Sequence, residues 1–77
     1  MLEKEPALIT FTIYKNPSDF PPGYAIRKWS ITERGPIAEE GRGGIWSIDE
    51  VRALIPSGYA RLERMEEDDP CIVETWI

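Results

Sequence analysis

The chain has 77 residues, a formal net charge of −5, one cysteine and no histidine. This length makes one domain, which buries only about 60% of the surface that the unfolded chain exposes. The acidic balance argues against general affinity for nucleic acid or anionic membrane, both of which attract positive charge. The missing histidine removes the commonest general base and metal ligand.

Cysteine usage and the first residues of the chain indicate the compartment. Cys71 is the single cysteine, so no internal disulfide forms, whereas small secreted domains normally carry several. The first six residues are rich in charge and no apolar signal region follows them. No apolar run approaches the length of a membrane span. We therefore expect a cytoplasmic protein.

The N-terminal half predicts two strands. Residues 1 to 7 are interpreted as a frayed terminus and residues 8 to 77 as a single domain. Residues 8 to 14 alternate between apolar and polar or aromatic side chains, as in a half-buried strand. The next segment, residues 16 to 23, is rich in proline and predicts a loop. Residues 24 to 33 predict a second strand, whose imperfect alternation indicates a bulge or two partly covered faces. The two strands can pair as a hairpin across the loop.

A glycine-rich segment and a short helix are expected in the middle of the chain. Residues 34 to 44 contain four glycines and predict a long, mobile connection. Ser47 is a preferred N-cap residue, Glu50 completes the capping-box pattern, and Pro56 ends the helix. The apolar face then holds Ile48, Val51, Leu54 and Ile55. The outer residues, expected to form no site, are Asp49, Arg52 and Ala53.

Two further strands are expected near the C-terminus. Residues 59 to 65 predict a strand, although a helix over residues 59 to 67 is an alternative on propensity. Residues 66 to 69 form an acidic turn, and residues 71 to 77 predict a strand that pairs with the one before the turn. The expected fold is α+β: a small, mostly antiparallel sheet of about four strands with one short helix packed on one face.

Motifs for catalysis, metals and cofactors are weak, and we predict no enzyme, no metal and no cofactor. Cys71 has no histidine to form a nucleophilic dyad with. The acids of residues 66 to 69 lack the alternate spacing and central glycine of a calcium loop. Residues 41 to 44 lack the lysine of a phosphate loop. Glu74 is expected to face solvent or to pair with an arginine on a neighbouring strand.

The best functional candidates are basic and tryptophan side chains in the middle of the chain. Arginine and tryptophan are enriched in binding hot spots, and aromatic side chains beside cations stack on single-stranded bases. For both tryptophans in this set, packing in the core is the alternative to a binding surface. The candidate binding residues are Arg27, Lys28, Trp29, Arg34, Arg42 and Trp46.

Several segments resemble a group of small uncharacterised bacterial proteins, some of them phage-associated. Their opening has the form Tyr-x-x-Pro-x-Asp-aromatic-Pro followed by an Arg-x-Trp strand, and residues 14 to 21 and 25 to 29 have this form. The capped helix of residues 47 to 56 and the ending of residues 68 to 77 also fit. The resemblance spans residues 11 to 77 and implies no activity and no functional residue.

Three hypotheses of function follow. The first is a non-enzymatic protein that binds another protein or itself, through an exposed edge provided by residues 71 to 77 or by the first strand. The second is weak binding of single-stranded nucleic acid through the Arg27-Lys28-Trp29 segment. The third is a small enzyme, or a subunit of one, that uses carboxylates.

Overall fold

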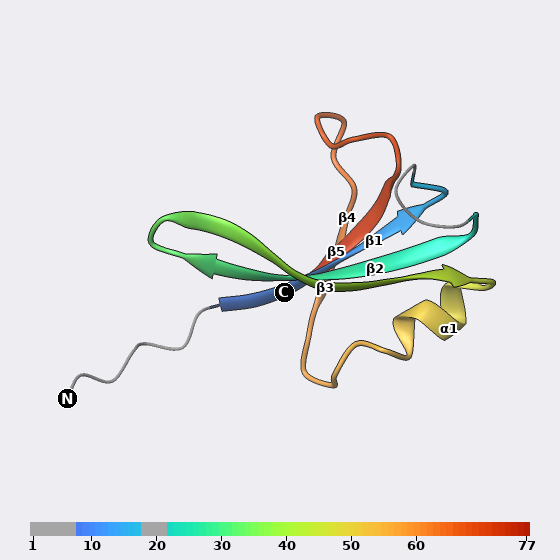
Figure 1. Cartoon of the computed structure of the whole chain (residues 1–77), viewed down its shortest axis with the longest axis horizontal. Coiled ribbons are helices and arrows are strands. Elements are labelled where there is room, and N and C mark those ends of the chain that lie inside the picture. The colour runs from blue at the N-terminus through green and yellow to red at the C-terminus, as the bar shows by residue number, and fades with distance from the viewer. Residues whose placement is uncertain (1–7, 18–21) are drawn as a thin grey trace.

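The computed structural model describes residues 8–17 and 22–77. The expectations for residues 1 to 7, and for residues 18 to 21 of the proline-rich loop, lie outside the described residues. Five antiparallel strands form one sheet in the order β3-β2-β1-β5-β4, joined by one short helix (Figure 1). The elements are β1 (Leu8–Lys15), β2 (Tyr24–Thr32), β3 (Gly35–Ile45), α1 (Ile48–Arg52), β4 (Arg61–Glu63) and β5 (Ile72–Trp76). The α+β class is confirmed, but the sheet has five strands rather than four.

The first two strands form the expected hairpin. β1 and β2 pair without a break, from Leu8 opposite Ile31 to Lys15 opposite Tyr24. Asn16 closes the connection: its backbone N–H donates to the Gly23 carbonyl at 2.7 Å, and its side-chain Oδ1 accepts from the Gly23 N–H at 2.8 Å. Asn16 has a φ of 51°, which asparagine tolerates better than most residues.

The expectation of a long connection over residues 34 to 44 is wrong, because residues 35 to 45 form the eleven-residue strand β3. Thr32 pairs with Gly35 across a turn of two residues, and glycine adopts the φ of 111° at position 35 without strain. The register with β2 shifts by one residue twice, and each shift adds a residue to β3. Glycine weakens a regular strand, but it is common at β-bulges. The glycines of β3 are therefore compatible with a bulged strand at the edge of the sheet.

Of the two explanations of the imperfect alternation in β2, partial cover on both faces applies and a bulge within β2 does not, because the extra residue at each register shift belongs to β3. The register shifts lie on its pairing with β3, and all its residues from Tyr24 to Thr32 are buried or half-buried. β2 is therefore covered in part on both faces while keeping an unbroken register with β1.

The helix begins where expected but is shorter. The Ser47 Oγ accepts a hydrogen bond from the Glu50 N–H at 3.1 Å, which confirms the N-cap. After Arg52 the backbone tightens, since the N–H groups of Leu54 and Ile55 donate to carbonyls three residues earlier rather than four. The expected helix from residue 48 to residue 55 therefore ends as α1 at Arg52, followed by turns.

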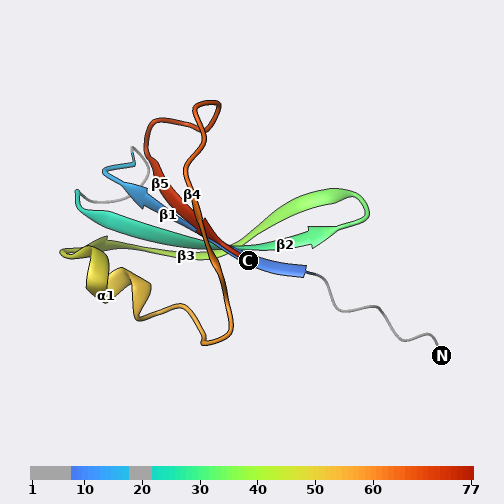
Figure 2. The same cartoon turned by 180° about the vertical axis from the view of Figure 1, so that it is seen from behind.

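The core lies between α1 and one face of the sheet. Because side chains alternate along a strand, the opposed residues Ile13 and Ile26 point to the same face. α1 covers this face near β2 and β3, as the two opposite views show (Figures 1 and 2). Leu54, expected on the buried helix face, is instead exposed. The buried cluster is Ile13, Ile26, Ile45 and Val51, with Phe11, Tyr24, Ile48, Ile55, Val73 and Trp76 packed around it.

The C-terminal hairpin is confirmed, and its first strand is short. β4 covers only Arg61–Glu63, so the strand interpretation of this segment holds and the helix alternative does not. Ala60 and Ile77 extend the pair by exchanging two backbone hydrogen bonds of 2.7 and 3.0 Å. In the acidic turn, the carboxylates of Asp68 and Asp69 accept backbone N–H groups at 2.9 Å each, so both serve the local turn.

The expected position of the exposed edge is wrong. β1 is the middle strand of the sheet, and β5 lies between β1 and β4. The two edges are therefore β3 and β4. Within the described residues, no helix combines the length and the apolar character needed to cross a membrane.

Candidate functional site

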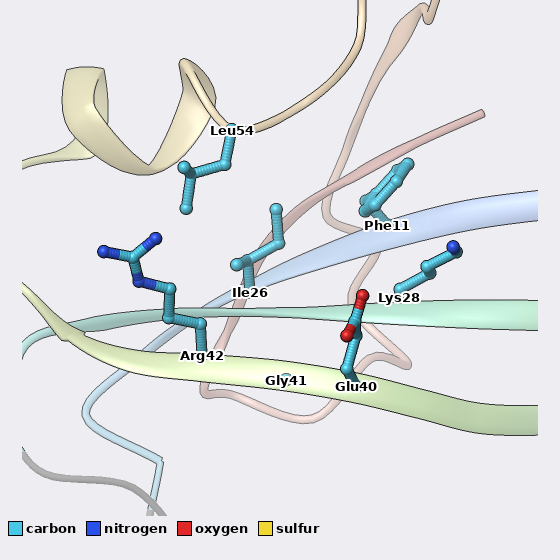
Figure 3. Close-up of a pocket in the computed structure, with 7 residues that line it drawn as sticks. All are labelled: Phe11, Ile26, Lys28, Glu40, Gly41, Arg42 and Leu54. Atoms are coloured by element: carbon cyan, nitrogen blue, oxygen red, sulfur yellow. The ribbon is translucent and has the colours of Figure 1, made fainter.

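A groove runs between β3 and the end of α1, made of two open pockets of about 370 and 360 Å³. The pockets share Arg42 and Leu54 in their linings, so they are adjacent, and together they are here called the α1–β3 groove. One pocket is drawn in Figure 3. The groove is lined by Phe11, Ile26, Lys28, Glu40, Gly41, Arg42, Gly44, Ile45, Trp46, Glu50 and Leu54.

Strand register brings the floor of this groove together. Phe11 lies opposite Lys28, and Ile26 lies opposite Arg42, and directly opposed residues of antiparallel strands share a face. Figure 3 shows their side chains, with that of Glu40, pointing toward the side on which Leu54 lies. The turn after α1 therefore forms the upper wall, and three strands form the floor.

The groove combines exposed apolar surface with charges that lack partners. The Trp46 side chain is 84% exposed and that of Leu54 is 41% exposed. Among the described residues, the side chains of Lys28, Glu40 and Arg42 form no hydrogen bond and no ion pair. An incoming molecule can thus meet apolar surface and both signs of charge without first breaking an internal contact. Core packing, the alternative considered for Trp46, is wrong.

The six candidate residues do not all gather in one place. Lys28, Arg42 and Trp46 line the groove. Arg27 and Trp29 flank Lys28 in β2 and therefore point to the opposite face of the sheet. Trp29 is half-buried there, and the Arg27 Nη1 donates to the Glu39 carbonyl at 3.2 Å. The sixth, Arg34, is exposed in the turn between β2 and β3.

A buried ionic network holds the helix end of the groove, and the sequence predicted only that Glu74 could pair with an arginine. Glu74 is only 1% exposed. Its carboxylate accepts two hydrogen bonds of 2.8 Å from the Arg52 guanidinium and one of 2.8 Å from the Trp76 indole N–H. The Arg61 guanidinium lies 3.6 Å from the same carboxylate. Pairing with an arginine is confirmed for Glu74, whereas its exposure to solvent is wrong.

The electrostatics of this network make Glu74 a structural anion. The hydrogen bonds from Arg52 lower the pKa of Glu74; burial opposes this, and the Trp76 N–H and the charges of Arg52 and Arg61 lower it further. In return, the hydrogen bond to Glu74 raises the pKa of Arg52. A carboxylate held ionised by donors on three sides stabilises the contact between α1, β4 and β5 rather than supplying protons. The available sequence signal was one acid within the apolar run of residues 72 to 76.

The remaining candidates for chemistry are dispersed. Within residues 8–17 and 22–77, no three side chains of histidine, cysteine, aspartate or glutamate converge as a metal site would require. The Cys71 thiol is half-buried, with its Sγ 4.0 Å from the Asn16 carbonyl. Gly41 and its neighbours, weighed above as a phosphate loop, belong to β3.

Of the residues that carry the resemblance to small bacterial proteins, 14 and 15 end β1, 25 to 29 lie in β2, 48 to 52 form α1 and 72 to 76 form β5, whereas 18 to 21 lie outside the described residues. Their described residues form no separate site: Trp29 lies on the face opposite the groove, and Glu74 is held in the ionic network. The resemblance stays a prediction. Comparison of the chain with family models, with curated proteins and with solved structures found no match.

Proposed function

We propose that this protein is a non-enzymatic binding protein whose α1–β3 groove accepts a polypeptide, from another protein or from a second copy of the chain. The observation that supports the proposal is the 84% exposed indole of Trp46 at a groove that also exposes Leu54. Tryptophan is among the residues that contribute most to binding energy in interfaces, because its large ring buries apolar area while its N–H can bond to a partner.

The chemistry of the surroundings fits a protein interface. An apolar centre with a polar rim is the common anatomy of such surfaces, and Lys28, Glu40 and Arg42 provide both signs of charge around the apolar side chains. β3 is also an edge strand, so its outward backbone groups can pair with an extended segment of a partner. The groove and the edge together suit a polypeptide better than a small metabolite.

The absence of catalysis and the cytoplasmic setting belong to the same proposal. The chain has no histidine, and Glu74, the most buried acid among the described residues, is paired with Arg52 and Arg61. A single half-buried thiol suits a reducing compartment. An assay of the purified protein against ester, phosphoester and glycoside substrates should give no turnover, and turnover abolished by a substitution in the groove would overturn this part.

Single-stranded nucleic acid is the second candidate, because Lys28 and Arg42 lie beside Phe11 and Trp46 in one groove. Bases can stack on aromatic side chains next to cations. Two acids in the same lining, Glu40 and Glu50, and the net charge of −5 oppose it. Titration with a single-stranded oligonucleotide at low salt, followed by tryptophan fluorescence, decides: salt-sensitive quenching would favour nucleic acid over a polypeptide.

Photo-cross-linking tests the proposed function directly. A photoreactive phenylalanine analogue is placed at position 46 in the full chain, in living cells, and at position 57 as an exposed control outside the groove. We expect a discrete protein adduct from position 46 that is absent from position 57 and is lost when Leu54→Asp is added. Equal, diffuse labelling from both positions would overturn the proposal.

A further inference from the structure

We infer that the polypeptide at this edge is a second copy of the chain, whose β3 pairs antiparallel with β3 around a two-fold axis at Gly41. The inference rests on the proposed function and identifies its partner. It starts from the position of β3, an eleven-residue strand at one edge of the sheet. The opposite edge, β4, has three residues and offers far less backbone to pair.

Charge gives the register. When Gly41 faces Gly41 of the second copy, Glu40 falls opposite Arg42 of that copy, and the two-fold axis repeats the pair. Glu40 and Arg42 point to the same side of the sheet (Figure 3), as residues directly opposite each other across an antiparallel pair must. Neither side chain has a partner among the described residues. Two opposite-charge pairs therefore form from four unpaired charges.

The same charges disfavour neighbouring registers. A slip that centres the pair on Glu40 places Glu40 opposite its own copy, and a slip that centres it on Arg42 does the same for the two arginines. Like charges directly opposite are destabilising in a sheet. Charges on an edge strand usually protect it from pairing, but this spacing, with a glycine between opposite charges, leaves one self-complementary alignment.

The ends of β3 agree with this alignment. Ile37 is 51% exposed, and the register places it opposite Ile45 of the second copy, which belongs to the core cluster. Trp46 directly follows β3, and extending the register by this one residue places it opposite Pro36 of the second copy, whose ring is apolar and whose nitrogen carries no hydrogen. The two most exposed large apolar side chains at the ends of β3 thus both gain cover in the register that pairs the charges.

Sedimentation velocity over a concentration series tests the pairing. We expect a monomer–dimer equilibrium for the native chain, and a dissociation constant raised by roughly tenfold or more by Arg42→Glu or by Glu40→Arg. The double variant E40R/R42E should return close to the native value, because it restores opposite charges across the axis. Far-UV circular dichroism shows whether each variant is folded.

A cysteine at the axis gives an independent readout that does not depend on charge. Gly41→Cys, in a chain that also carries Cys71→Ser, should form an intermolecular disulfide rapidly under mild oxidation, because only an axial residue faces its own copy. Gly43→Cys in the same background is the matched control, since position 43 faces Glu39 of the second copy, and it should cross-link slowly.

The outcomes separate this inference from the proposed function. A native chain that remains monomeric up to about 1 mM, while position 46 still cross-links a different polypeptide, overturns the β3 pairing and leaves the binding function. The β3 pairing is also overturned if the native chain dimerises but E40R/R42E does not recover the native dissociation constant, and positions 41 and 43 cross-link equally. The dimer contact then lies elsewhere. A monomer without any adduct overturns both.

Discussion

The Glu74 carboxylate and the Arg52 guanidinium are joined by two hydrogen bonds of 2.8 Å, which fasten β5 to the last turn of a five-residue helix. A helix this short has little stability of its own. The paired bonds, in which both carboxylate oxygens meet the planar guanidinium, have the geometry of the strongest side-chain contacts. The position of α1, and with it the wall that Leu54 adds to the groove, depends on this contact.

Glu74→Gln should destabilise the fold by about 1.5–3 kcal/mol at neutral pH, the usual loss for a hydrogen bond to a charged group. Urea unfolding followed by tryptophan fluorescence measures it. Glu67→Gln is the matched control, since Glu67 is exposed and in the acidic turn, and it should change the free energy of unfolding by less than about 0.5 kcal/mol. Equal effects of the two changes would contradict a special role for Glu74.

The same network predicts an acid-sensitive stability. The pKa of Glu74 is lower in the folded chain than its ordinary value of 4.5. The carboxylate therefore adds stability that is fully present above about pH 4.5 and is lost as the pH falls through the folded pKa. The native chain should lose stability over this acid range, and Glu74→Gln should lose less of it. Parallel pH profiles of the two proteins, from urea unfolding at each pH, would contradict this.

Ser47→Ala should cost about 0.5–2 kcal/mol, because it removes the side-chain acceptor of the Glu50 N–H at the start of α1. Ser57→Ala, at an exposed position after Pro56, is the control with the same chemical change. Chemical denaturation compares them, and binding in the groove should keep its specificity. Changed specificity with unchanged folding would mean that the helix has a direct role in recognition.

Gly23→Ala should be more destabilising than Gly58→Ala. Both glycines have positive φ, 117° and 96°, so both substitutions strain the backbone by about 1–3 kcal/mol. A Cβ at Gly23 would also lie 2.9 Å from the Ile45 carbonyl oxygen, whereas a Cβ at Gly58 meets nothing within 4 Å. Thermal unfolding ranks the two variants, and the reverse order would contradict the close approach of the β1–β2 loop to the end of β3.

Trp46→Phe should leave stability within about 0.5 kcal/mol, as expected for an exposed side chain away from the core. It should also remove the fraction of fluorescence that iodide quenches most readily. Trp76→Phe is the contrast, because it deletes the 2.8 Å hydrogen bond to Glu74 and should destabilise the fold. Persistent iodide quenching after Trp46→Phe would show that another tryptophan is the exposed one.

Local patterns predicted the elements that depend on local chemistry. Alternation identified β1 and β2, and the turn residues between them indicated their hairpin. Ser47 and Glu50 located the start of α1, because a cap depends only on residues within one turn. The C-terminal hairpin followed from the acidic turn in the same way.

The elements that depend on tertiary pairing were not visible. Glycine-rich residues 35 to 45 have no strand pattern of their own and become β3 only because β2 offers an edge. The order of the segments along the chain does not reveal that β5 pairs with β1. The prediction of which strands lie at the edges of the sheet was therefore wrong. Glu74 and Arg52 are 22 residues apart in the chain, and only the tertiary fold, in which α1 lies near β2 and β3, lets the Arg52 side chain reach β5.

For the candidate site, three of the six residues selected by type share the groove. Strand alternation separates Arg27 and Trp29 from Lys28, an effect that composition cannot reveal. Leu54 was predicted to lie on the apolar face of the helix, but it lies on the groove wall, because α1 ends one turn earlier than predicted.

The strand order has a consequence for the chain as it is synthesised. β1 acquires its second neighbour only when residues 72 to 76 have left the ribosome, although β2, β3 and α1 are complete much earlier. Until then one side of β1 presents unpaired backbone groups, and the Glu74 carboxylate that binds the Arg52 guanidinium has not yet been synthesised. An open strand beside apolar side chains recruits other chains readily. A product truncated before residue 72 should therefore be the most aggregation-prone form of this protein and the one that depends most on chaperones.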